Sequence, residues 1–130
     1  MNTALEFHDS QVSKIDMLGS ALSVAFSSAY VHRSVGKPGV DSGSGYVGPV
    51  EMLLSEASWA GPLDECIGKL SDGKLSVAGE PFALVPLPSE HIGQISLELV
   101  FANGAMLTAT ATSLVVRFSG EPHFVESFFC

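Results

Sequence analysis

The chain has 130 residues, of which 46% are hydrophobic and 15% charged, and its formal net charge is −8. This length suits one domain, residues 1–130, which can fold without disulfide or metal staples. The low charged share excludes a disordered chain. The balance of 6 basic against 14 acidic residues repels phosphate backbones and anionic lipid. It therefore excludes nucleic acid and membrane as expected partners and favours a basic protein partner.

The number of cysteines and the first residues of the chain indicate the cellular compartment of the protein. Cys66 and Cys130 are too few for a disulfide scaffold. The first residues lack the basic segment and apolar run of a signal peptide, and no apolar stretch reaches the about 18 residues that a membrane span needs. We therefore expect a cytoplasmic protein.

The first predicted element is a hairpin, in which Val12–Met17 and Ala21–Arg33 flank Gly19-Ser20. The second segment alternates with period two, which is typical of a strand. This alternation predicts one shared face for Leu22, Val24, Phe26, Tyr30 and His32. On that face His32 is either a partly buried histidine bonded to the backbone or, near the strand end, a side chain that projects into a pocket.

A glycine-rich stretch follows. Residues 34–48 hold five glycines and Pro38, which predicts a long loop, and such loops are usually functional or mobile. Within it, residues 43–48 match the spacing Gly-x-Gly-x-x-Gly. A nucleotide site needs a helix after that motif, whereas the next predicted element is the strand Val50–Ala57, so no nucleotide is expected.

Three short elements are predicted next. Pro62 followed by two acids suits the first turn of a short helix that ends before Asp72. Leu75–Ala78 and Phe82–Val85 are predicted as short strands. The prolines at 86 and 88 exclude a central strand there.

The clearest local signal is a hairpin of Ile95–Phe101 and Ala105–Ala111. A two-residue turn at Asn103-Gly104 competes with a three-residue loop in which Gly104 takes a left-handed conformation. Only the longer loop separates an apolar face from a mainly polar one, so burial should select it. It pairs Leu99 with Leu107, Leu97 with Ala109, and Glu98 with Thr108.

The last predicted strands are Leu114–Phe118 and Phe124–Phe128. The final strand carries large apolar groups on both faces, Phe124 with Phe128 and Val125 with Phe129. Because an exposed apolar edge is an aggregation hazard, we expect this strand to be central, packed between layers, or buried in a homodimer interface. Pairing with Ala4–His8 would make it central and bring His8 near Glu126 or His123.

These elements predict an all-β, mainly antiparallel fold: a β-sandwich or partly open β-barrel of about eight short strands with at most one short helix. The predicted core consists of Leu22, Val24, Phe26, Leu54, Leu75, Val77, Ile95, Leu97, Leu99, Leu107, Val116 and Phe118.

Candidate site residues are sparse. No two histidines have the spacing of metal ligands, so no metal and no cofactor are expected, and no catalytic residue is assigned. His32, Tyr46 and Trp59 are candidates to line a pocket near the glycine-rich segment. The full set of candidate ligand-binding residues is His8, Asp9, His32, Tyr46, Trp59, His123 and Glu126.

The opening Leu5-Glu6-Phe7-His8-Asp9-Ser10, with Val12, resembles that of uncharacterised small bacterial β-rich proteins with an N-terminal Phe-His-Asp-Ser motif. The closing segment 120–126 is similar to theirs. Some of those proteins are immunity-like or accessory factors, so the resemblance implies a small bacterial binding domain and carries over no catalytic residue.

Two functions follow as hypotheses. The first is a non-catalytic binding or protein-interaction module, immunity-like or accessory. The second is a small-ligand-binding protein or enzyme with a pocket near residues 36–48. The sequence favours the first, because it contains no recognisable catalytic constellation.

Overall fold

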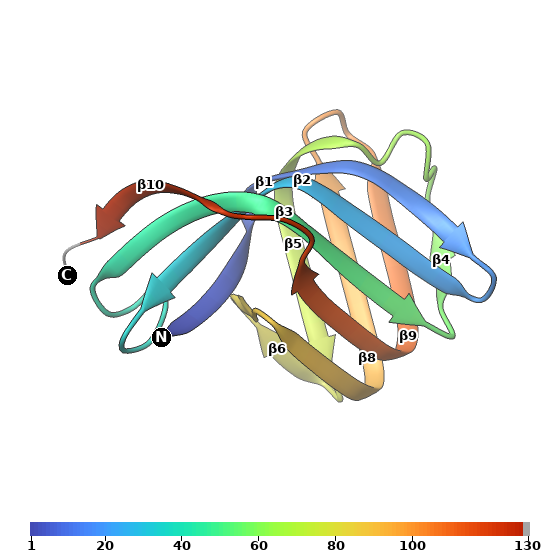
Figure 1. Cartoon of the computed structure of the whole chain (residues 1–130). Helices are drawn as coiled ribbons and strands as arrows, with labels where there is room; N and C mark the ends of the chain where they lie inside the picture. Colours follow the sequence, from blue (N-terminus) through green and yellow to red (C-terminus); the bar gives the residue numbers. More distant parts are fainter. Residues whose placement is uncertain (129–130) are drawn as a thin grey trace.

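The computed structural model describes residues 1–128, which form ten β-strands and no helix (Figure 1). Every strand pairing is antiparallel. The strands are β1 (Asn2–Leu18), β2 (Ala21–Ser34), β3 (Gly43–Ser55), β4 (Ser58–Ala60), β5 (Gly68–Val77), β6 (Glu80–Phe82), β7 (Val85–Pro86), β8 (Ser89–Phe101), β9 (Met106–Phe118) and β10 (His123–Phe128). Residues 1–128 accordingly contain no helix that could cross a membrane.

Six of the strands close into a barrel. The sheet runs β3-β2-β1-β5-β8-β9, and a further pairing of β3 with β9, from Val50 opposite Phe118 to Ser55 opposite Ser113, joins its two ends. The four remaining strands are peripheral. The predicted all-β antiparallel fold is therefore confirmed, as a closed barrel and not a sandwich.

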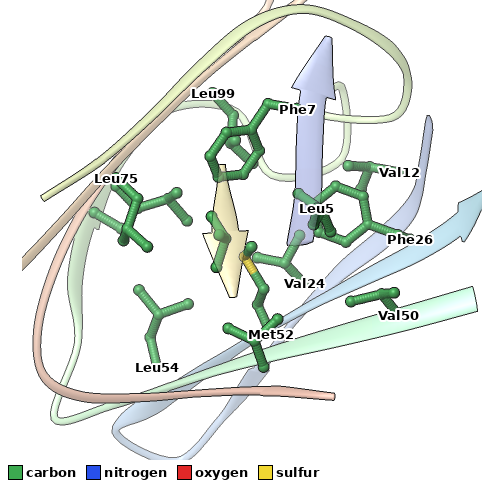
Figure 2. Packing of buried hydrophobic residues seen from close by; sticks show 14 of the residues in the cluster. Leu5, Phe7, Val12, Val24, Phe26, Val50, Met52, Leu54, Leu75 and Leu99 are labelled. Carbon is green, nitrogen blue, oxygen red and sulfur yellow. The ribbon is translucent and has the colours of Figure 1, made fainter. Parts of the chain in front are cut away.

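Inward-facing aliphatic side chains fill the barrel. Figure 2 shows side chains from facing strands meeting there, among them Val24, Met52 and Leu99. Of the twelve predicted core residues, ten are buried, while Val77 and Phe118 are half-buried against the same cluster. Alternating burial along the strands thus follows the period of two in the sequence.

The β8–β9 hairpin has the register that burial was expected to select. Leu99 lies opposite Leu107 and Leu97 opposite Ala109. Phe101 N donates to Ala105 O at 2.9 Å, and Gly104 has φ +93°. The three-residue loop with a left-handed glycine is confirmed.

The shared face predicted for β2 is wrong beyond Phe26. A bulge between Phe26 and Ala29 interrupts the register on both sides of β2. A bulge adds one unpaired residue and so reverses which side chains face inward. Ala29 and Val31 are therefore buried, and His32 lies on the face opposite to that of Val24.

The glycine-rich stretch is mostly strand. β3 begins at Gly43, so the loop predicted over residues 34–48 shortens to 35–42. The glycines allow close approach: a Cβ on Gly48 would lie 2.8 Å from Pro122 Cα, where the chain enters β10. At Gly48 this contact with a segment some seventy residues away explains the glycine, and local flexibility does not.

The short helix predicted at Pro62 is a single turn. Glu65 N and Cys66 N both donate to Pro62 O, at 2.9 and 3.1 Å. Cys66 is buried, and Gly68, with φ +94°, already begins β5. The chain turns back into the barrel before a second helical turn can form.

The C-terminal strand does not pair with Ala4–His8. β10 pairs with β3, Phe124 lying opposite Tyr46 and Phe128 opposite Gly43, so two strands separate it from β1. It is an edge strand, and neither central nor between layers. Phe129 and Cys130 lie outside the described residues.

Candidate functional site

Beyond the barrel, four strand segments continue as an open sheet, which we call the extension. It consists of residues 2–6 of β1, 30–34 of β2, 43–47 of β3, and β10. Figure 1 shows it projecting to one side of the barrel, with the start of β1 and the end of β10 at its far end. The bulges of β1 and β2 lie where the extension joins the barrel.

The register places polar and aromatic groups on one side of the extension. One row across the sheet reads Ala4, His32, Gly45 and Glu126. Side chains of paired residues and of residues two apart share a face. The His32 face, as we name it, carries Glu6, Tyr30, His32, Glu126 and Phe128.

These side chains contact one another directly. The His32 ring stacks on Phe128 with centroids 5.2 Å apart and planes 26° apart, and meets the edge of Tyr30 at 5.2 Å. The Tyr30 hydroxyl donates to Glu126 Oε1 at 2.5 Å. His32 Nε2 lies 3.4 Å from Glu6 Oε1. Because a carboxylate only accepts, Nε2 carries the proton of that contact.

Gly45 makes the cluster possible. A Cβ at this position would collide with the hydroxyl of Tyr30 and lie 3.2 Å from the Phe128 ring. The two aromatic rings occupy the space that any larger side chain would take, as at other strand glycines covered by a neighbouring ring.

Tyr30 is held as a hydrogen-bond donor. Burial raises the pKa of its phenol, and the hydrogen bond and negative charge of Glu126 raise it further, as do Glu6 and Asp9. The phenol therefore stays protonated at neutral pH and fastens β10 to β2.

Two cavities meet at His32. The larger, about 540 Å³, is bordered by β1, β2, the loop after β2, and the β6–β7 segment. Its lining residues are Glu6, His32, Lys37, Pro38, Gly39, Val40, Pro81, Phe82, Ala83 and Leu84. The smaller, about 240 Å³, also has His32 in its lining, together with Arg33, Asp41 and Phe128.

The loop that borders both cavities is internally bonded. Lys37 N donates to Asp41 Oδ2 at 2.6 Å, and Asp41 N donates to Lys37 O at 2.9 Å. This loop therefore forms a defined wall.

The structure brings together His32 and Glu126, both in contact with Tyr30. It does not bring His8 near Glu126, because β10 pairs with β3. Tyr46 lies on the opposite face, against Phe124 and under the Arg33 guanidinium at 4.4 Å. Among residues 1–128, therefore, no pocket joins His32, Tyr46 and Trp59, in contrast to the prediction from the sequence.

The other predicted residues are dispersed. Trp59 belongs to β4, opposite Ala109 on the barrel, and His123 is exposed on β10. His8 Nδ1 lies 3.4 Å from Asp9 Oδ2, and Lys69 Nζ lies 3.9 Å from the other oxygen of Asp9.

One group of residues has the donor atoms of a metal site. Glu6, His8 and Asp9 place one ligand atom each within 4.8 Å of the others. Two of the three are exposed, and the Lys69 ammonium already supplies a cation to Asp9. The absence of a metal stays a prediction.

Sequence reasoning missed the residues that build the site around His32, namely Glu6, Tyr30, Lys37, Phe82 and Leu84. The Phe-His-Asp-Ser opening held a partial signal. It forms the β1 bulge, where Phe7 is in the core and the buried Ser10 hydroxyl accepts from Tyr30 N at 2.9 Å. That bond ties the bulge to the strand carrying His32.

Comparison of the chain with protein-family models, with curated proteins and with solved structures gave no match. Its own side chains therefore indicate its chemistry. They offer a cluster that fixes an edge strand, and beside it a cavity with charged and apolar walls.

Proposed function

We propose that this protein is a non-catalytic interaction module that associates through the outer edge of β10, and that the occupant of this edge is a second copy of the chain. One observation carries the proposal. β10 is the last strand in the sheet order, and Phe124 and Val125 on it are 59% and 47% exposed.

The edge has only part of the usual protection against strand addition. Soluble proteins blunt exposed edges by shortness, by charged side chains and lysine above all, by proline, or by bulges. β4, at the other end of the sheet order, has only three residues. β10 has six, His123–Phe128, and none is lysine, arginine or proline. Its protection is limited to the charge of Glu126 and one irregularity between Phe124 and Glu126.

A second copy suits this edge because a two-fold axis can set β10 antiparallel to itself. Each copy then gains main-chain hydrogen bonds, and the exposed apolar groups of both are covered at once. Tyr30 and His32 hold β10 on the sheet through Glu126 and Phe128. The edge is thus formed before association, which lowers the entropic cost.

Sedimentation equilibrium of the full chain over a wide range of concentrations tests the proposal. We expect a monomer–dimer equilibrium for the parent and its loss in Phe124→Glu and in Val125→Glu. Ile92→Glu is the matched control, because Ile92 is 82% exposed on β8. A parent that is monomeric at every concentration, or a control as impaired as the β10 variants, contradicts the proposal. Thermal melts identify a variant that has lost its fold.

The net charge of −8 favours a basic protein as a second candidate occupant, in keeping with an accessory or immunity-like role. Salt distinguishes the two. Screening weakens a complex of opposite charges, whereas it relieves the repulsion between two acidic copies. Dimerisation that strengthens with salt supports the second copy.

A further inference from the structure

The larger cavity at His32 carries two opposite charges that do not pair with each other. Glu6 and Lys37 both border it. Among residues 1–128, no acidic group lies within 4.0 Å of Lys37 Nζ. The cavity therefore has a negative group and a positive group that are both available to a ligand.

The negative group is oriented. His32 Nε2 contacts Oε1 of Glu6 at 3.4 Å, and the two side chains are 13% and 32% exposed. Among residues 1–128 no hydrogen bond is made to Oε2 of Glu6, so this oxygen is left to accept from a ligand. Partial burial of the carboxylate reduces its screening by water. An ammonium group is the natural donor to such a carboxylate.

The remaining lining of the cavity is mostly apolar. Phe82, Leu84, Pro38 and Val40 border the cavity. Leu84 packs on Gly39, where an added Cβ would lie 2.7 Å from Leu84 Cδ1, so this wall is closely packed. The volume, about 540 Å³, falls within the about 300–1,000 Å³ typical of small-molecule sites.

We propose that this cavity binds a small zwitterion with an apolar side chain, the chemistry of a free hydrophobic amino acid. Its ammonium pairs with Glu6, its carboxylate pairs with Lys37, and its side chain packs on Phe82 and Leu84. A ligand with a single charge leaves one of the two protein charges unpaired. The site is separate from the β10 edge, and neither proposal depends on the other.

Chemical-shift titration of the labelled full chain tests the site with three probes. L-Phenylalanine carries both charges, phenethylamine lacks the carboxylate, and 3-phenylpropanoate lacks the ammonium. We expect L-phenylalanine to shift His32 and Gly39 resonances and to bind about two- to fivefold more tightly than either analogue, the value of one solvent-screened ion pair.

Two variants test which charged side chain pairs with which charged group of the ligand. Glu6→Gln should abolish the advantage of L-phenylalanine over 3-phenylpropanoate, and Lys37→Gln its advantage over phenethylamine. The matched controls are Glu98→Gln, a half-buried acid on β8, and Lys74→Gln, an exposed base on β5; both should bind as the parent does. The proposal is overturned if L-phenylalanine causes no shift, if either analogue binds equally well, or if neither site variant changes the ranking. The probe comparison needs no substitution and so decides the matter even if a variant fails to fold.

Discussion

The barrel and the extension share three long strands, yet they differ in the side chains that one face of these strands carries. In the barrel, β1, β2 and β3 pack through aliphatic groups such as Val24, Met52 and Leu54, all fully buried. In the extension, the same strands bury Leu5 and Val31 on one face. Their other face carries Gly45, Tyr30 and His32, which β10 covers. The bulges of β1 and β2 mark the change from one to the other.

This difference assigns stability to the barrel and binding to the extension. A closed barrel has no free edges, and its packed core specifies one structure. The extension keeps an edge, two cavities and several charged groups, which a core could not accommodate without cost. The barrel therefore acts as the rigid support, and the extension presents the groups that contact other molecules.

The largest loss in the free energy of unfolding is expected for a substitution in the barrel. Leu99→Ala removes a fully buried side chain and should lower the free energy of unfolding by about 2–5 kcal/mol, because lost burial and a cavity add together. Denaturant unfolding measures this. A variant as stable as the parent would refute the assignment of Leu99 to the core.

A smaller and more local effect is expected in the extension. Gly45→Ala places a methyl group against Tyr30 and Phe128 and should cost about 1–3 kcal/mol by overpacking, with faster amide exchange in β10 and unchanged exchange in β8. Ser44→Ala, on the same strand but the opposite face, is the control. Equal loss of protection in β8 would mean that the two regions do not respond separately.

A substitution in the β8–β9 turn should lower the free energy of unfolding by less. Gly104 has φ +93°, and a Cβ there would meet no neighbouring atom, so Gly104→Ala tests backbone conformation alone. We expect a loss of about 1 kcal/mol, since left-handed backbone disfavours a side chain. A thermal melt unchanged from that of the parent would contradict this reason for the glycine.

Replacing Tyr30 should change the free energy of unfolding least, and only at alkaline pH. Its pKa is raised by burial and by Glu126, so the folded chain holds this proton more tightly than the unfolded chain. That contribution is present below the ordinary phenol pKa of about 10 and is lost as pH rises above it. Tyr30→Phe should therefore lose less stability than the parent above about pH 10. Parallel curves of unfolding free energy against pH for the two proteins would exclude this role.

Much of the barrel could be predicted from the sequence. The β8–β9 register followed from Leu97, Leu99 and Leu107, because a slip of one residue would expose them. The β-class and most of the core followed from the same alternation.

The extension could not be predicted in the same way. The β2 bulge reverses the faces of Tyr30 and His32, yet no letter near Phe26 signals it. The glycines at 45 and 48 indicated a loop, since the aromatic and proline groups that explain them come from distant parts of the chain. Glu6 and Lys37 border one cavity only because β1 lies beside β2 and the loop after it.

Amide hydrogen exchange across β10 at low and high protein concentration tests the central claim most directly. The N–H groups of His123–Phe128 that point away from β3 have no strand partner among residues 1–128 of the same copy, so we expect association to protect them. We predict that their exchange slows as concentration rises, while exchange in β8 stays constant. Equal exchange rates at both concentrations for every amide of β10 would contradict association through this edge.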